Sequence, residues 1–143
     1  FKEALDPEFK TYIKDVMDNA KILAETIMSR GIDVVSNGTE NHIVLVDLRS
    51  KNITGKDLEK LLGTVNITVN KNSVPNDTAS PFVTSGIRIG TPAITTRGFG
   101  KSEVIQVANW IADIIDNFED QTVHEKVREE VHALTEEYPV YQL

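Results

Sequence analysis

The sequence predicts an α+β domain in which helices pack against a mostly antiparallel sheet of about three strands. The chain has 143 residues, of which 40% are hydrophobic and 26% charged, a composition that suits one compact domain spanning residues 1–143. Apolar residues recur at helical spacing in four segments, and short β-branched runs bounded by turn residues lie between them. The resulting order of helix, strands, helix, strands, helix, helix is typical of an α+β sandwich.

A long N-terminal linking helix is expected at about residues 7–30. Asp6 can cap it, Pro7 suits its first position, and Gly31 is expected to end it. We interpret its apolar stripe as a packing face, formed by Phe9, Ile13, Val16, Met17, Ala20, Leu23, Ala24 and Ile27.

Two extended segments follow, Asp33–Ser36 and His42–Asp47, separated by an Asn37-Gly38 turn. The second segment is almost continuously apolar, as a strand covered on both faces would be. A short helix is then expected to begin with a capping box at Thr54–Asp57 and to end at Gly63.

The second half of the chain is expected to continue with a strand at Val65–Val69 and a loop at Asn70–Phe82. Long loops in small domains are usually functional or disordered. A strand at Gly86–Gly90 precedes two helices. The first follows Ser102, and the second opens with a capping box at Thr122–Glu125 and stops before Pro139.

The net charge of −7, from 22 acidic against 15 basic residues, argues against a nucleic acid as partner. No apolar run approaches the roughly 18 residues of a membrane span, and no signal pattern opens the chain. Cysteine is absent, which excludes disulfides and thiolate sites and fits a cytosolic protein. Because the chain begins at Phe1, we interpret it as part of something longer.

Arg88 is the most informative candidate for binding. Its neighbours Ile87 and Ile89 point to the opposite face of the strand, while Gly86 and Gly90 share its face without side chains. Glycine within a strand often marks close approach by a ligand or by another backbone, and a guanidinium matches a carboxylate. A ligand site and a structural ion pair explain this pattern equally well.

The loop Asn70–Asp77 is rich in amide and hydroxyl groups, which suit a heterocycle with donors and acceptors, although such residues more often form a solvated turn. The three histidines lack metal-ligand spacing, and no phosphate loop or nucleophile elbow is present. We therefore expect neither a catalytic residue nor a metal site.

Several segments resemble the serine hydroxymethyltransferase family, in particular its bacterial type. They are Thr39–Arg49, Asn66–Asp77, Ser85–Gly98 and Tyr138–Tyr141. The segment Ser85–Gly98, around Arg88, is highly specific to the family. The resemblance covers essentially the whole chain. It implies the small C-terminal domain of a fold-type I pyridoxal-phosphate enzyme, without the large cofactor domain.

The family interconverts serine and glycine with pyridoxal phosphate and transfers the one-carbon unit to tetrahydrofolate, in cytoplasmic homodimers or tetramers. The resemblance assigns the substrate carboxylate to Arg88, the pterin ring to Asn72, and the lining of the folate site to Ser80, Pro81 and Phe82.

The family's Schiff-base lysine has no match in this chain, so it is expected to contain no cofactor-binding residue and to be inactive without its large domain. Two alternatives remain open. One is the small domain of another fold-type I enzyme such as an aminotransferase, which would share the arginine but bind no folate. The other is a non-enzymatic module that retains the fold.

Overall fold

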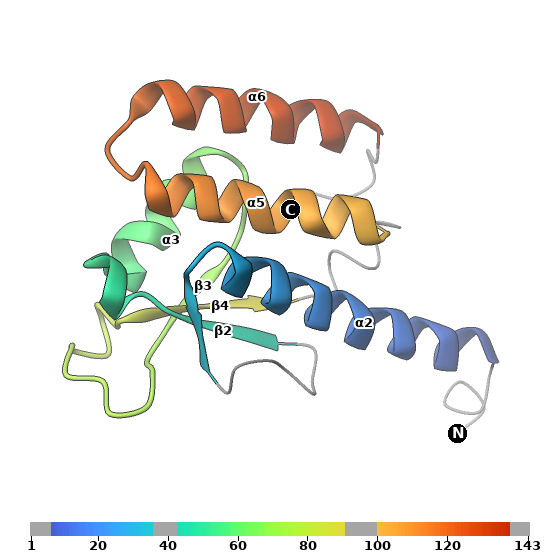
Figure 1. The fold of residues 1–143 in the computed structure, drawn as a ribbon, viewed down its shortest axis with the longest axis horizontal. Helices are drawn as coiled ribbons and strands as arrows, with labels where there is room; N and C mark the ends of the chain where they lie inside the picture. Colours follow the sequence, from blue (N-terminus) through green and yellow to red (C-terminus); the bar gives the residue numbers. More distant parts are fainter. Residues whose placement is uncertain (1–6, 36–42, 91–99, 138–143) are drawn as a thin grey trace.

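The computed structural model describes residues 7–35, 43–90 and 100–137, although the side chains of residues 7–13, 135 and 137 are not described. These residues form four α-helices and one antiparallel sheet, which confirms the α+β class (Figure 1). The elements in order are α2 (Pro7–Ser29), β1 (Asp33–Val34), β2 (Ile43–Asp47), the 3-10 turn η2 (Arg49–Lys51), α3 (Gly55–Thr64), β3 (Asn70–Asn72), β4 (Gly86–Gly90), α5 (Lys101–Asp116) and α6 (Gln121–Glu137).

The sheet has four strands in the order β1-β2-β4-β3, one more than the three or so expected. Every neighbouring pair is antiparallel, and Leu45 of β2 lies opposite Arg88 of β4, which in turn lies opposite Asn70 of β3. Val44, Val46, Ile87 and Ile89 are buried, whereas Leu45 is half-buried and Arg88 is exposed. The face bearing Leu45, Asn70 and Arg88 is called the outer face below.

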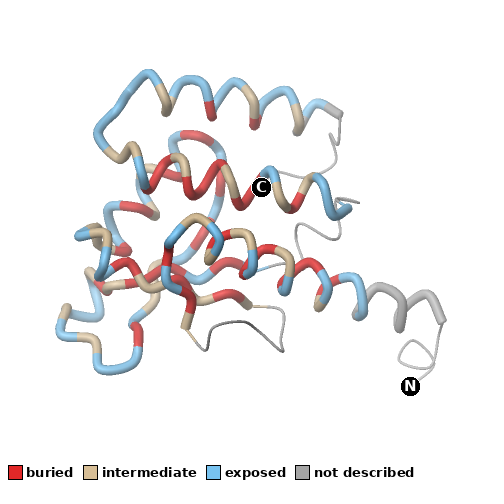
Figure 2. The backbone as a smooth tube through the Cα atoms, in the orientation of Figure 1, coloured by how far each residue is buried: buried red, intermediate tan, exposed pale blue. Residues whose placement is uncertain are grey.

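The helices build the core on the other face of the sheet. Helix α2 packs against β1 and β2, α5 packs against α2, and α6 lies beyond α5 on the same side of the sheet (Figure 1). Arg30 ties the end of α2 to α5, because its guanidinium donates to Asn109 Oδ1 at 2.9 Å and to Asp113 Oδ1 at 2.7 Å. Buried residues therefore follow the inward sides of α2 and α5, while the surfaces facing away are exposed (Figure 2).

Helices α2 and α3 end in the same way, through a residue in the left-handed region. Gly31 has φ +78°, and the amide of Ile32 donates to the carbonyl of Ile27 at 3.4 Å. In α3 the corresponding residue is Asn66, with φ 67°. Gly63, predicted to end this helix, lies inside it, because asparagine also tolerates the conformation that a Schellman motif requires.

The predicted strand Val65–Val69 is wrong, and the strand lies at Asn70–Asn72, within the predicted loop. Burial alternates along Val65–Val69, as in a strand, but its first residues are bonded back to the end of α3. The amide of Ile67, for instance, donates to the carbonyl of Leu62 at 2.9 Å. Pairing with β4 can begin only once the chain has left this helix end.

Two helix starts also differ from prediction. Helix α6 is capped by Asp120, whose Oδ1 accepts from the amide of Thr122 at 3.0 Å, so Thr122 is not the capping residue. Helix α5 begins at Lys101, and Glu103 Oε1 accepts from the amide of Gly100 at 2.9 Å. The predicted cap of α3 is confirmed, since Thr54 Oγ1 accepts from the amide of Asp57 at 3.2 Å.

Several predicted features lie outside the described residues. They are the Asp6 cap, Ser36 with the Asn37-Gly38 turn, the start of the second strand at His42, the segment Thr91–Gly98, and Tyr138–Tyr141 with the stop at Pro139. Among the described residues, no helix is both long enough and apolar enough to cross a membrane.

Candidate functional site

Arg88 differs from the other arginines whose side chains are described. Arg30, Arg49 and Arg128 each form an ion pair with a carboxylate, at 2.7, 2.7 and 3.0 Å. Within the described part of the chain, Arg88 has no such partner, and its side chain is exposed on the outer face. Of the two explanations for the sequence pattern, a structural ion pair has no support among these residues.

Strand β4 holds Arg88 in a fixed place. It is an inner strand, paired with β2 on one side and β3 on the other, so backbone bonds on both edges fix its position. The adjacent Ile87 and Ile89 are buried in the core, which sets the face from which Arg88 projects. The backbone that carries the guanidinium is therefore held rigidly.

The space beside Gly86 is filled by other parts of the chain, which is the second of the two explanations for a glycine within a strand. A Cβ atom at Gly86 would lie 2.6 Å from Val74 Cγ1 and 2.6 Å from the carbonyl oxygen of Val46. Val74 belongs to the loop after β3 and is itself buried. This glycine makes room for the loop to pack on the sheet, so a ligand would have to approach Arg88 from another direction.

That loop, residues 73–85, is organised by the carboxylate of Asp77. Asp77 Oδ2 accepts from the amides of Val74 at 3.2 Å and Ser85 at 2.8 Å. Its Oδ1 accepts from the amide of Ala79 at 2.8 Å and from the hydroxyl of Ser85 at 2.7 Å. These bonds, above all those from the Ser85 hydroxyl and the Ala79 amide, lower the pKa of Asp77 to about 2.

A second carboxylate, Asp47 at the end of β2, is held close to the same loop by Arg49. The guanidinium of Arg49 lies 2.7 Å from Asp47 Oδ2 and donates to the carbonyl oxygen of Asn76 at 3.5 Å. Hydrogen bonding from Arg49 lowers the pKa of Asp47. The tip of the loop is thus connected to β2 as well as to β4.

Asn72 lies in β3, opposite Gly86, and therefore on the same face as Arg88 in the neighbouring strand. Its side-chain amide donates to the carbonyl of Ser73 at 2.8 Å. The structure thus places Asn72 and Arg88, which are 16 positions apart in the sequence, on adjacent strands and one face.

Ser80, Pro81 and Phe82 form an exposed turn at the other end of the loop. The carbonyl of Ser80 accepts from the amides of Val83 at 3.0 Å and Thr84 at 2.9 Å. The Phe82 ring is 80% exposed, and it is the exposed large hydrophobic residue of the described chain.

The residues that follow this turn also contact the start of α3, a contact that was not predicted from the sequence. The carbonyls of Thr84 and Val83 accept from the amides of Gly55 at 3.0 Å and Lys56 at 2.9 Å. Thr84 is buried and has φ 59°. Only the glycine at position 55 hinted at this close approach.

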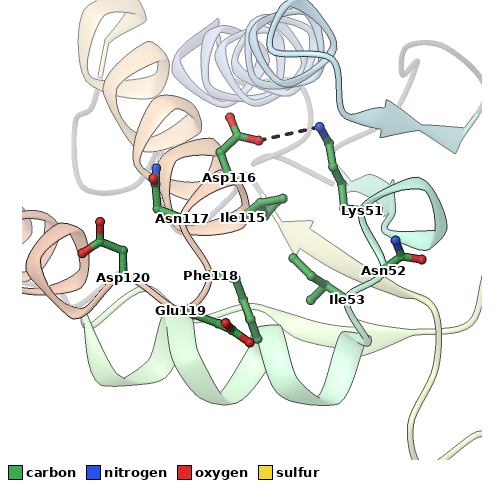
Figure 3. Close-up of a pocket in the computed structure, with 9 residues that line it drawn as sticks. All are labelled: Lys51, Asn52, Ile53, Ile115, Asp116, Asn117, Phe118, Glu119 and Asp120. Carbon is green, nitrogen blue, oxygen red and sulfur yellow. Dashed lines mark ion pairs between the residues drawn. The ribbon is translucent and has the colours of Figure 1, made fainter.

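A hollow of about 510 Å³ lies elsewhere, between η2 and the α5–α6 turn (Figure 3). Phe118 and Ile53 point into it, and Lys51 Nζ faces Asp116 Oδ1 at 3.7 Å across its edge. A smaller hollow of about 310 Å³ shares Phe118. None of the candidate residues lines either hollow, and the Lys51–Asp116 pair already neutralises part of the charge.

The described residues contain no group of histidine and carboxylate side chains arranged to hold a metal ion. His132 pairs with Glu136 at 2.9 Å on the surface of α6, and His124 bonds the carbonyl of Asn117 at 3.0 Å. The histidines of the described chain thus have structural partners on or beside one helix.

Comparison with known proteins agrees with the resemblance found in the sequence. The family model for serine hydroxymethyltransferase matches residues 1–111. Over 141 residues the chain is 57% identical to the serine hydroxymethyltransferase of Halorhodospira halophila, 58% to that of Shewanella piezotolerans and 59% to that of Pseudoalteromonas atlantica. Each alignment covers 99% of this chain but 34% of the relative, so the chain spans about a third of the relatives' length. With these identities along nearly its whole length, the chain belongs to the serine hydroxymethyltransferase family.

Proposed function

We propose that this chain is the C-terminal substrate-binding domain of a cytoplasmic serine hydroxymethyltransferase. The complete protein would interconvert serine and glycine and transfer the one-carbon unit to tetrahydrofolate. The observation that carries the proposal is Arg88, an exposed arginine without a carboxylate partner among the described residues, on an inner strand of the sheet. Its role would be to bind the carboxylate of the amino acid.

The chemistry of Arg88 suits this role. A guanidinium presents two parallel N–H donors to a carboxylate, which fixes both the position and the rotation of the amino acid. Rotation matters because the bond to be broken must stand perpendicular to the conjugated ring of the cofactor. Because strand β4 is paired on both edges, the backbone of Arg88 would stay in place, and with it the guanidinium, while serine is converted to glycine.

Asn72 and the Ser80–Phe82 turn are proposed to bind the folate. An asparagine side chain offers a donor and an acceptor, which a pterin ring requires. The exposed ring of Phe82 provides a flat apolar surface beside the polar groups of the loop. Asn72 lies on the same face as Arg88, which would bring the folate and the amino acid to one side of the sheet.

Pyridoxal phosphate, which the family implies, does not fit the described residues of this chain. Its Schiff base needs a lysine whose surroundings favour the neutral amine, together with an anchored phosphate. The lysines whose side chains are described are exposed or half-buried, and Lys51 is already close to Asp116. We therefore expect the cofactor site to be formed by a separate large domain, and the chain to be inactive without that domain and a second subunit.

The aminotransferase alternative is not favoured by the family match. The exposed Phe82 and the polar loop beside β4 also have no evident use in an enzyme that binds no folate.

The test is a hybrid protein in which this chain replaces the matching third of the Halorhodospira halophila relative. Glycine is titrated into the hybrid and binding is followed through the cofactor's absorbance. Arg88→Lys keeps the charge but loses the fork, so we expect glycine to bind about 30- to 100-fold more weakly, as for one member of a desolvated charge pair.

Arg128→Lys is the matched control, because Arg128 lies on the surface of α6 in an exposed pair with Glu125. It should bind glycine like the unmodified hybrid, and both variants should retain the cofactor. Unchanged glycine affinity in Arg88→Lys would show that Arg88 is a structural residue and would remove the basis of the proposal.

A further inference from the structure

The loop between β3 and β4 is held together by one carboxylate rather than by regular secondary structure. Asp77 gathers donors from three places: Val74 near the start of the loop, Ala79 in its middle, and Ser85 at its end. Asn72 precedes Val74 by two residues, and Ser80 directly follows Ala79. We call Asp77 with its four donors the Asp77 clasp.

The geometry of the clasp requires a carboxylate. Three backbone amides and one hydroxyl all point their hydrogens at Asp77, and each of its oxygens accepts two of them. An asparagine would place an NH₂ group where one oxygen stands. In either orientation that NH₂ would face at least one backbone N–H, so a donor would meet a donor.

We propose that Asp77 is a positioning residue for the folate, because its clasp fixes the Ser80–Phe82 turn relative to the start of β4 and to Asn72, which pairs with Gly86 of that strand. This inference rests on the proposed function, since it concerns the loop assigned there to the folate. Asp77 would not touch the reacting atoms. It would act by lowering the conformational freedom that the loop must lose when the ligand binds.

Arg88 should be affected much less than the loop. Strand β4 is paired with β2 over its whole length and with β3 from Gly86 to Arg88, so its position does not depend on Asp77. Loss of the clasp should therefore lower the affinity for folate and leave the affinity for glycine unchanged. A merely structural carboxylate would affect both ligands or neither.

The experiment uses the hybrid protein and measures binding of tetrahydrofolate by calorimetry at saturating glycine, and binding of glycine by absorbance. Asp77→Asn should weaken tetrahydrofolate binding by about tenfold and leave glycine binding unchanged. Asp33→Asn is the matched control, because Asp33 is exposed on the edge strand β1. It should change neither affinity.

Asn72→Ala separates this inference from the proposed function. If Asn72→Ala weakens tetrahydrofolate binding and a folded Asp77→Asn does not, the clasp has no positioning role although the folate assignment stands. If neither variant changes the affinity, the folate assignment fails and the inference fails with it. Equal losses for glycine and tetrahydrofolate in Asp77→Asn would also overturn the inference.

Ser85→Ala provides a second variant should Asp77→Asn fail to fold. It removes the hydroxyl donor at 2.7 Å and leaves the three amide bonds of the clasp in place. Its tetrahydrofolate affinity should fall by about threefold, again without a change for glycine. A folded Ser85→Ala with the tetrahydrofolate affinity of the unmodified hybrid would overturn the proposal in that case.

Discussion

Two glycines of α3 should respond to the same substitution with opposite signs. Gly55 begins the helix, and a Cβ atom there would lie 2.2 Å from both the carbonyl oxygen of Gly86 and Thr84 Oγ1. Gly63 is exposed near the end of the same helix, and a Cβ atom there would have no heavy atom within 4 Å. Gly55→Ala should therefore destabilise the chain, and Gly63→Ala should stabilise it.

The magnitudes follow from these distances. Ordinary contacts begin at 3.4 Å, so the start of α3 must move by about 1 Å to accommodate the methyl group that Gly55→Ala adds. That shift breaks the bonds from the amides of Gly55 and Lys56 to the carbonyls of Thr84 and Val83, at about 1 kcal/mol each. With about 1–3 kcal/mol of overpacking, the total loss is about 3–5 kcal/mol. Gly63→Ala should gain about 0.5–1 kcal/mol from helix propensity.

Both variants can be measured on the isolated chain by urea and thermal unfolding followed by circular dichroism. For a chain of 143 residues, 1 kcal/mol corresponds to about 3 °C in Tm. Gly55→Ala should lower Tm by about 10–15 °C, and Gly63→Ala should raise it by about 2–3 °C. A Gly55→Ala variant as stable as Gly63→Ala would refute the close packing of α3 on the turn before β4.

Two further predictions concern stability. Asn66 occupies the left-handed position after α3, so Asn66→Gly should leave the free energy of unfolding nearly unchanged, whereas Asn66→Val should lower it by about 1–2 kcal/mol, both measured in urea. Asp77 has a pKa of about 2 in the folded chain, below its ordinary 3.8. Its contribution to stability is therefore complete above about pH 4 and is lost as the pH falls towards 2. Unfolding experiments from pH 5 to 2 should show a shallower acid loss for Asp77→Asn, and an unchanged slope would contradict the clasp.

The helices and the two inner strands could be predicted because each leaves a strong local signal. The stripe of α2 and the glycine after it define that helix, and buried apolar residues define β2 and β4. β3 could not be predicted, because its three residues are polar and show no alternation. It is a strand because β4 pairs with it and because Glu59 of α3 accepts from the amide of Lys71 at 2.7 Å, contacts made by residues far away in the sequence.

The sequence could predict which residues belong to the candidate site, but not how they are arranged in space. Alternation along β4 predicts the face of Arg88, and the position of Asn72 on the same face depends on the register of β3. The role of Asp77 was not visible, because an aspartate in a polar loop is ordinary. Its importance appears when the chain folds back and Ser85 lies within 2.7–2.8 Å of it.

The separation of the two faces of the sheet explains how binding residues can change without loss of the fold. The core lies on the helix face and contains Val44, Val46, Ile87 and Ile89, while Arg88 projects from the outer face. An exposed guanidinium costs little desolvation in the free domain. Under the proposed function, Arg88 would bind the substrate strongly only once the substrate and the large domain exclude water from it, since charge pairs gain most in a dry site. Substitution of Arg88 should therefore leave Tm nearly unchanged in the isolated chain and still weaken glycine binding in the hybrid. That combination distinguishes a binding residue from a structural one.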